Sequence, residues 1–113
     1  MRVSGSTASG NGDDGIEARD KCRIIGNQCE GNGFDGDGAG IRTFDEHNHI
    51  EGNHVVGNDR GIDVDSSSSI IIKNTASNNT INYSIVAGNH VGQIIVNPGF
   101  GFSSSNSWAN FAF

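Results

Sequence analysis

The chain has 113 residues, of which 17 are Gly and one is Pro, and its formal net charge is −6. This length fits one domain, and a hydrophobic content of 34% is low for a conventional globular core. The acidic balance argues against a nucleic-acid partner, which requires a basic face. No run of 18 apolar residues exists, so no membrane insertion is expected.

The sequence repeats with steps of 21, 26 and 21 residues when it is aligned on its recurring asparagines. Within each unit, apolar residues alternate in three short runs separated by turn residues, which predicts three half-buried strands. A period near 21 with three strands is typical of one coil of a parallel β-helix. Leucine-rich repeats share this period, but the chain contains no Leu. The aligned columns are Val3, Ile24, Ile50 and Ile71; Ser6, Asn27, Asn53 and Asn74; Ala8, Cys29, Val55 and Ala76; Asn11, Asn32, Asn58 and Asn79; and Ile16, Ile41 and Ile62.

The expected coils follow one another as residues 3–14, 15–39, 40–60 and 61–81. The second is longer because residues 33–39 replace a shorter turn and add four residues at a corner. A last, irregular coil is expected over 82–98, with 82–85 in the place of 61–64 and 94–97 in the place of 71–74. The tail, 99–113, is interpreted as a cap that plugs the end of the stack or as a contact surface between subunits. Its large aromatic residues are Phe100, Phe102, Trp108, Phe111 and Phe113.

Stacked coils lie ~4.8 Å apart, so equivalent residues are expected to form ladders. The aliphatic columns then face inward. Asn27, Asn53 and Asn74 are expected at a turn, because Asn tolerates the left-handed backbone conformation. Their side-chain amides can also bond to the next coil, as amides do in stacked β-arrays.

Four stretches carry a resemblance to a known family. They are Gly-Ile-Asp-Val-Asp-Ser at 61–66, Ile-Ile-Ile-Lys-Asn-Thr-Ala-Ser-Asn-Asn at 70–79, Asn-Tyr-Ser-Ile-Val-Ala-Gly-Asn at 82–89 and Trp-Ala-Asn-Phe at 108–111. Over residues 3–113 the chain resembles bacterial right-handed parallel β-helix repeat proteins of the pectate-lyase-like superfamily. The resemblance implies a secreted or cell-surface protein. Enzymes of that superfamily act on acidic polysaccharides, and many members have no assigned activity.

Candidate functional residues alternate with the buried Ile in the first strand of each coil. Glu17, Arg42 and Asp63 form one outward column, and Arg19, Phe44 and Asp65 form the next. The resemblance places catalytic residues on this face. Glu17 and Asp63, two coils apart, would lie ~9.6 Å apart, at the upper edge for a pair of inverting glycosidase carboxylates. Arg42 lies between them and would neutralise both, so an alternating ladder of exposed charges is the competing interpretation.

The signatures of the related enzymes are absent. Polygalacturonase-like proteins carry a paired Asp on the strand face and a downstream Arg-x-Lys, whereas here Asp13 and Asp14 fall in a Gly-flanked turn and no Arg-x-Lys occurs. The Tyr-Gly-(Phe/Ile)-Asp-Pro-His motif of mannuronan epimerases is missing as well. Lyases of the superfamily carry arginines and calcium-binding carboxylates on this face. In this chain the candidate arginines there are Arg19 and Arg42 only. The sequence therefore leans against an enzyme.

Metal sites have weak candidates. Asp13, Asp14, Asp35 and Asp37 share one corner, and oxygen-rich, Gly-flexed loops suit calcium, although a solvated acidic loop explains them too. His47 and His49 could begin a transition-metal site, and His54 and His90 lie elsewhere. No cofactor is expected. Cys22 and Cys29 are both expected to point inward across the Asn27 turn, where a disulfide bond is conceivable and buried free thiols are favoured.

These observations together predict an all-β fold: a single right-handed parallel β-helix of four to five coils with an aromatic C-terminal cap, occupying residues 1–113. The expected function is that of a non-catalytic structural or carbohydrate-contacting module that self-associates, with a trimer ahead of a dimer by analogy. The alternative is a polysaccharide lyase or glycoside hydrolase that uses Glu17, Asp63 and Arg42. The chain starts without the apolar stretch of a signal peptide, which indicates either a cytosolic protein or a fragment of a longer chain. Because the resemblance implies a secreted or cell-surface protein, the fragment is the expectation.

Overall fold

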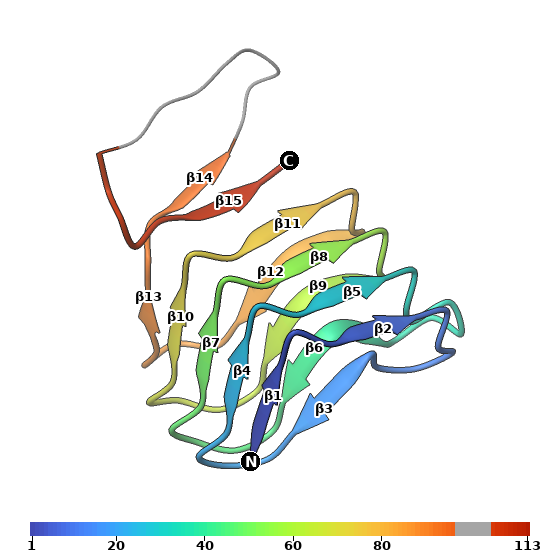
Figure 1. The fold of residues 1–113 in the computed structure, drawn as a ribbon, viewed down its shortest axis with the longest axis horizontal. Coiled ribbons are helices and arrows are strands. Elements are labelled where there is room, and N and C mark those ends of the chain that lie inside the picture. Colours follow the sequence, from blue (N-terminus) through green and yellow to red (C-terminus); the bar gives the residue numbers. More distant parts are fainter. Residues whose placement is uncertain (97–104) are drawn as a thin grey trace.

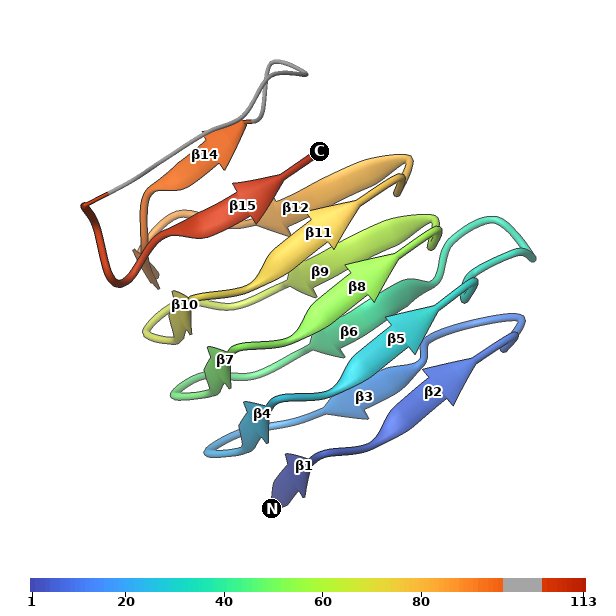
Figure 2. The ribbon, with the colours of Figure 1, turned by 45° about the horizontal axis from the view of Figure 1, so that its top comes forward.

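The structure is a computed structural model, which describes residues 1–96 and 105–113. These residues form β-strands only, arranged in three parallel sheets of four to six strands, as in a parallel β-solenoid (Figures 1 and 2). Sheet A holds β1 (Arg2–Ser4), β4 (Arg23–Ile25), β7 (His49–Glu51), β10 (Ile70–Ile72) and β13 (His90–Val91). Sheet B holds β2 (Thr7–Ser9), β5 (Gln28–Glu30), β8 (His54–Val56), β11 (Thr75–Ser77), β15 (Asn110–Ala112) and β14 (Ile94–Val96). Sheet C holds β3 (Ile16–Ala18), β6 (Ala39–Thr43), β9 (Arg60–Val64) and β12 (Ile81–Ile85).

Strand registers confirm the three inward columns of the sequence alignment. In sheet A, Val3, Ile24, Ile50 and Ile71 are paired in order. In sheet B, the same holds for Ala8, Cys29, Val55 and Ala76. In sheet C, the column Ile16, Ile41 and Ile62 continues to Tyr83. Side chains alternate across a strand, so one apolar residue per strand is enough to line the interior.

The interior is small and completely closed in the middle of the stack. Ile24, Ile41, Ile50, Ile62 and Ile71 all have 0% of their surface exposed. They belong to one core cluster that also contains Val55, Val64 and both cysteines, against which Val3, Ala8, Tyr83 and Ile85 pack as partly buried residues. A residue in such a column is covered by its neighbours above and below, so its burial depends on the presence of the adjacent coils.

Two asparagine ladders turn the chain between the sheets. In the first, Asn53 Oδ1 accepts hydrogen bonds from the backbone N–H (2.9 Å) and the side-chain amide (3.0 Å) of Asn27. Asn53 Nδ2 donates to the carbonyl of Ile24 (2.9 Å) and to Asn74 Oδ1 (3.0 Å). The second ladder repeats this pattern through Asn11, Asn32, Asn58 and Asn79. The predicted bonding of Asn amides to the next coil is therefore confirmed.

The left-handed backbone conformation lies one residue earlier than the sequence predicts. In the first ladder it is adopted by Gly26 (φ 66°), Gly52 (φ 66°) and Lys73 (φ 58°), which precede Asn27, Asn53 and Asn74. The assignment of this conformation to the asparagines was wrong. Glycine populates it without steric cost, and the asparagine that follows is left to bridge the coils. The Gly-Asn dipeptide that recurs in the sequence is the signal for this turn.

A third ladder, which the sequence alignment did not reveal, turns the chain from sheet C to sheet A. The backbone N–H of Cys22 donates to Asn48 Oδ1 (3.0 Å), that of Asn48 donates to Ser69 Oγ (3.1 Å), and that of Ser69 donates to Asn89 Oδ1 (2.9 Å). Asn and Ser both accept there, so no single residue type marks the column.

The C-terminal end differs from the expectation. Val91, and not Ile94, pairs with Ile71 in sheet A. β14 then joins sheet B, and β15 lies between β14 and β11, so the tail adds a strand to the sheet (Figure 2). This places Asn110 where the next coil would supply an asparagine: its Oδ1 accepts from the backbone N–H (3.0 Å) and the side-chain amide (3.1 Å) of Asn74. The substitution of 94–97 for 71–74 was therefore wrong, and Phe100 and Phe102 lie outside the described residues.

None of the residues that the structure describes forms a helix of the length and hydropathy needed to span a bilayer.

Candidate functional site

The outer face of sheet C brings together the residues that the sequence singled out. Glu17 is paired with Arg42, and Arg42 with Asp63, in the predicted register. Their environments differ, however. Glu17 is exposed, whereas Asp63 retains only 2% of its surface accessible to solvent. A carboxylate so deeply buried requires cationic or hydrogen-bonding partners.

Those partners are two arginines. Asp63 Oδ2 lies 2.8 Å from Arg60 Nη1 and 3.8 Å from Arg42 Nε. Arg42 Nε also lies 3.0 Å from Asp65 Oδ2, and Arg60 Nη2 lies 3.0 Å from Asp37 Oδ1. The result is a continuous network of two guanidinium groups and three carboxylates. Arg60 was missed by the sequence analysis because it lies at the start of β9, outside the outward columns that were considered.

The carboxylates of this network raise the pKa of both arginines. The pKa of Arg60 is raised by its hydrogen bond to Asp63 and by the charge of that carboxylate. Burial opposes the charge of Arg42, but the hydrogen bond to Asp65 and the charges of Asp65, Asp14 and Asp63 raise its pKa on balance. Asp63 is thus buried and lies against both of these guanidinium groups.

Phe44 makes cation–π contacts with two arginines. The guanidinium carbons of Arg19 and Arg42 lie 5.0 Å and 4.7 Å from the ring centroid. Such contacts contribute about 0.5–1 kcal/mol each at exposed sites. Of the residues predicted to contact a ligand, Arg19 therefore lies against Phe44, and Arg42 connects Phe44 to Asp65.

The acidic corner is only partly assembled. Asp14 Oδ1 accepts the backbone N–H of Ala39 (2.7 Å), and Asp37 pairs with Arg60. Partial burial raises the pKa of Asp14 above its usual range, against the effect of the Ala39 hydrogen bond. Asp35 and Asp13 lie nearby, because a side chain added at Gly12 would contact Asp35 and one added at Gly38 would contact the backbone of Asp13. Among residues 1–96 and 105–113, no three His, Cys, Asp or Glu side chains are grouped closely enough to hold a metal ion.

The cysteines and histidines occupy different environments. Cys22 and Cys29 are both buried free thiols, as favoured from the sequence, and burial raises the pKa of Cys29 to about 12. His47 pairs with Glu46 in an exposed turn (3.8 Å). His49 Nε2 lies 3.1 Å from Glu51 Oε2, without the geometry of a hydrogen bond.

A groove on the outer face of sheet A is a feature that the sequence analysis did not predict. It has a volume of about 540 Å³ and is lined by His49, Ile70, Ile72, His90, Val91, Gly92 and Trp108. Trp108 is 57% exposed, and Lys73 Nζ lies 4.8 Å from the centroid of its ring. Lys73 in turn pairs with Glu51 (3.3 Å). The sequence pattern placed Trp108 in a terminal cap, whereas its ring lines this groove.

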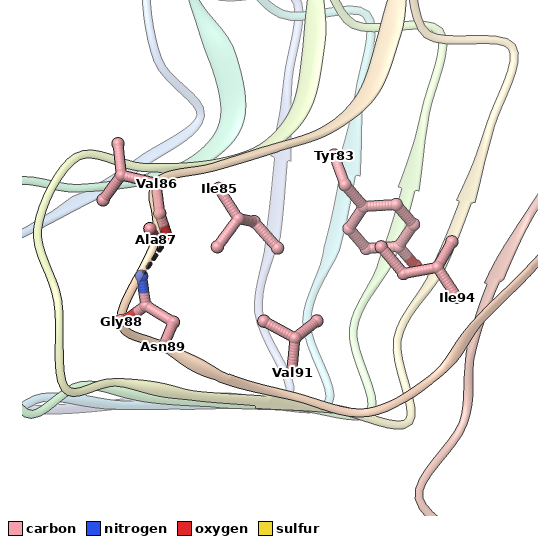
Figure 3. A pocket seen from close by; sticks show the side chains of 8 residues that line it. All are labelled: Tyr83, Ile85, Val86, Ala87, Gly88, Asn89, Val91 and Ile94. Carbon is pink, nitrogen blue, oxygen red and sulfur yellow. Dashed lines mark hydrogen bonds between the residues drawn. The ribbon is translucent and has the colours of Figure 1, made fainter.

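A second hollow, of about 380 Å³, lies at the C-terminal end of the interior. Figure 3 shows the side chains of Tyr83, Ile85, Val91 and Ile94 around it. The Tyr83 hydroxyl donates to the carbonyl of Phe111 (2.8 Å) and lies 3.0 Å from that of Asn74. Burial raises the pKa of this hydroxyl well above its usual range. Tyr83 therefore ties sheet C to the tail strand.

Comparison of the chain with protein-family models, with curated proteins and with solved structures finds no match.

Proposed function

We propose that this protein is a non-catalytic, carbohydrate-contacting module: a single right-handed parallel β-helix of four to five coils, related to the pectate-lyase-like superfamily and closed at its C-terminal end by the aromatic tail. The observation that carries the proposal is the environment of Asp63. It is 2% exposed and lies 2.8 Å from Arg60, so of the two carboxylates that the alternative requires, only Glu17 is open to solvent beside the charged and aromatic contact groups.

The contact groups suit a polysaccharide. Arg42 and Arg19 both lie over Phe44, and guanidinium groups donate hydrogen bonds in a fork that matches a carboxylate. Glu17 remains exposed beside them. An acidic sugar chain that contacts Arg19 and Arg42 would therefore be held without being cleaved.

Two measurements on one sample test the proposal. We expect the protein to be retarded in native gels that contain polygalacturonate, and we expect no product from the same polymer. Product formation would be followed by the ultraviolet absorbance of unsaturated uronates, for a lyase, and by new reducing ends, for a hydrolase. Product that disappears in Glu17→Gln and Asp63→Asn variants would establish the alternative, a lyase or glycoside hydrolase that uses Glu17, Asp63 and Arg42.

Self-association and an extracellular or surface location are part of the proposal. Exposed apolar side chains occur toward the C-terminal end of the stack: Ile81 is 47% exposed, Val86 46% and Val96 70%. Such surfaces mark contact sites, and a trimer is the assembly we favour by analogy with other β-helix proteins. Light scattering should then give about three times the chain mass of 11.8 kDa, and a monomeric mass would contradict this part of the proposal.

A further inference from the structure

Two asparagines of the second ladder occur in the same local sequence, Gly-Asn-Gly, at residues 10–12 and 31–33. Glycine has no Cβ, so its backbone nitrogen is open to attack on the side-chain amide of a preceding asparagine. The next two asparagines of the ladder are followed by Asp and by Thr instead. Asn11 and Asn32 are therefore the ladder positions at which the side chain can most readily react with its own backbone.

The structure holds these two asparagines differently. Asn32 is 2% exposed. Its Nδ2 donates to Asn58 Oδ1 (2.9 Å) and to the carbonyl of Ala8 (3.0 Å). The backbone N–H of Gly33 donates to the carbonyl of Asn11 (2.9 Å). While the stack is closed, neither the amide of Asn32 nor the nitrogen of Gly33 is free to approach the other.

Asn11 lies in the turn that follows β2, an edge strand of sheet B (Figure 2). It is exposed, and its side chain makes one ladder bond, from Nδ2 to Asn32 Oδ1 (2.8 Å). Within residues 1–96 and 105–113, the backbone N–H of Gly12 has no hydrogen-bond acceptor. The reacting side chain and the attacking nitrogen are thus both accessible at this Asn-Gly pair.

We propose that Asn11 is a site of spontaneous deamidation and that this modification releases the first coil (residues 3–14) from the stack. The backbone nitrogen of Gly12 gives its proton to hydroxide and forms a bond to Cγ of Asn11. The Cγ–Nδ2 bond breaks, and the nitrogen takes a proton from water and leaves as ammonia. A second water molecule opens the succinimide ring at either of its carbonyl groups, which gives aspartate or isoaspartate at this position. The reaction consumes water and involves no change of oxidation state.

The products do not fit the place of Asn11 in the ladder. A carboxylate cannot donate to Asn32 Oδ1, so the side-chain bond to the second coil is lost. The new negative charge lies at the corner that already holds Asp13 and Asp35, and like charges repel across the two coils. Isoaspartate also lengthens the main chain in a turn whose carbonyl accepts the N–H of Gly33. All three changes weaken the attachment of the first coil to the second.

Release of the first coil would uncover a thiol in the core. Ala8 of β2 is paired with Cys29 of β5, and Cys29 is a free cysteine with 0% of its surface exposed. When β2 moves away, Cys29 loses its cover on that side. A thiol reagent should therefore label Cys29 faster in the modified protein than in the unmodified one.

The test is to age the folded protein in mildly alkaline buffer and to follow both sites by the masses of tryptic peptides. Residues 3–19 form one tryptic peptide, in which Asn11 is the only Asn and Gln is absent, so its mass gain reports this site alone. We expect Asn11 to react about tenfold faster than Asn32, which reacts only through transient local opening. In guanidinium chloride the two Gly-Asn-Gly sites should react at similar rates, so the unfolded chain is the matched control.

The second measurement follows the labelling of Cys29 during ageing. The labelling rate should rise with the modified fraction in the wild type and stay constant in Asn11→Ser, which cannot form the succinimide. Equal rates at Asn11 and Asn32 in the folded protein would overturn the site, and so would an intact Asn11 under conditions in which the unfolded chain reacts. Modification of Asn11 without faster labelling of Cys29, or the same rise in Asn11→Ser, would overturn the release of the first coil. The proposal is independent of the carbohydrate contact and survives its failure.

Discussion

The middle of the stack and its C-terminal end use the same kinds of residues but bury them differently. Ile24, Ile50 and Ile71 form one inward column and are 0% exposed, whereas Val91, which follows them in that column, is 39% exposed. Val91 has a neighbour on one side only within the described part of sheet A. Burial in this fold is therefore supplied by the adjacent coils, and the same side chain contributes more or less stability according to its place along the stack.

Hydrogen bonding shows the same contrast. Asn53 is bonded to coils on both sides by its own side chain. At the end of the stack, the partner of Asn74 comes from Asn110, 36 residues away in the tail. The stack thus continues its ladders by local repetition, while the end completes one ladder with a distant segment.

The largest difference in stability between the middle of the stack and its C-terminal end is expected for substitutions in the inward aliphatic column of sheet A. Ile50→Ala removes a completely buried side chain and should lower the free energy of unfolding by about 3 kcal/mol, the usual range for such truncations being 2–5. Val91→Ala, in the same column but partly exposed, should cost about 1 kcal/mol. Urea unfolding of both variants measures the difference. Equal losses would show that the end is as well covered as the middle.

The second effect concerns the ladder amides. Asn53→Ala removes four hydrogen bonds. The side-chain amides of Asn27 and Asn74 keep other bonds, but the backbone N–H of Asn27 and the carbonyl of Ile24 lose this partner. We expect a cost of about 3 kcal/mol, since a buried group left unsatisfied costs about 1–3 kcal/mol. Asn11→Ala is the control, because that exposed side chain makes a single ladder bond, to Asn32. The control should lose less than about 1 kcal/mol in the same unfolding experiment.

A third, smaller effect tests whether the tail is an integral part of the stack. Asn110→Ala removes four bonds, as Asn53→Ala does. We expect a loss of only about 2 kcal/mol, because β15 can open locally before the rest unfolds. Hydrogen exchange reports this directly: the amide of Phe111, bonded to the carbonyl of Asn74, should lose protection, while that of Thr75, bonded to Asn53, should keep it. Loss of protection at both amides would mean that stack and tail unfold as one unit.

The smallest effect is a dependence on alkaline pH. The pKa of Cys29 is raised to about 12 by burial, whereas a thiol in the unfolded chain ionises near 8.5. Above that value the unfolded chain loses a proton that the folded chain retains, so stability is constant below about pH 8.5 and falls above it. The loss between pH 7 and about pH 9.5 should be about 1.4 kcal/mol. Cys29→Ala, which keeps Tyr83, should abolish this slope; an unchanged slope would assign it to another group.

The regular part of the fold could be predicted from the sequence because equivalent residues recur at a nearly fixed spacing, and this spacing determines which residues of neighbouring coils pair. The alignment of Ile24, Ile50 and Ile71 fixes the strand register, since one residue of slip would turn each apolar side chain to the outside. The insertion at 33–39 was also placed correctly, because the columns on both sides of it remain aligned: Cys29 pairs with Val55, and Ile41 with Ile62.

The irregular part could not be predicted by the same means. The position of β15 depends on pairing between distant segments, and the repeat offers no spacing for it. A weak signal does exist in the residues Asn110-Phe111-Ala112, which match Asn74-Thr75-Ala76 in the pattern Asn-x-Ala. The ion pairs of Arg60 were missed for a different reason. They depend on how far a long side chain reaches across neighbouring coils, which a column of sequence positions does not describe.

The longer turn between β5 and β6 has a consequence for how such a protein can change. Asn32 keeps its bonds to Asn58 immediately before the turn, and Ala39, after it, is anchored by Asp14. The number of residues in a coil can therefore change without changing the distance between neighbouring coils. That distance is set by the strand pairing and the asparagine hydrogen bonds, and the turn between β5 and β6 does not contribute to it. Loops of different length and chemistry can therefore replace one another between β5 and β6. Such a change alters the surface at this corner and leaves the stack of coils unchanged.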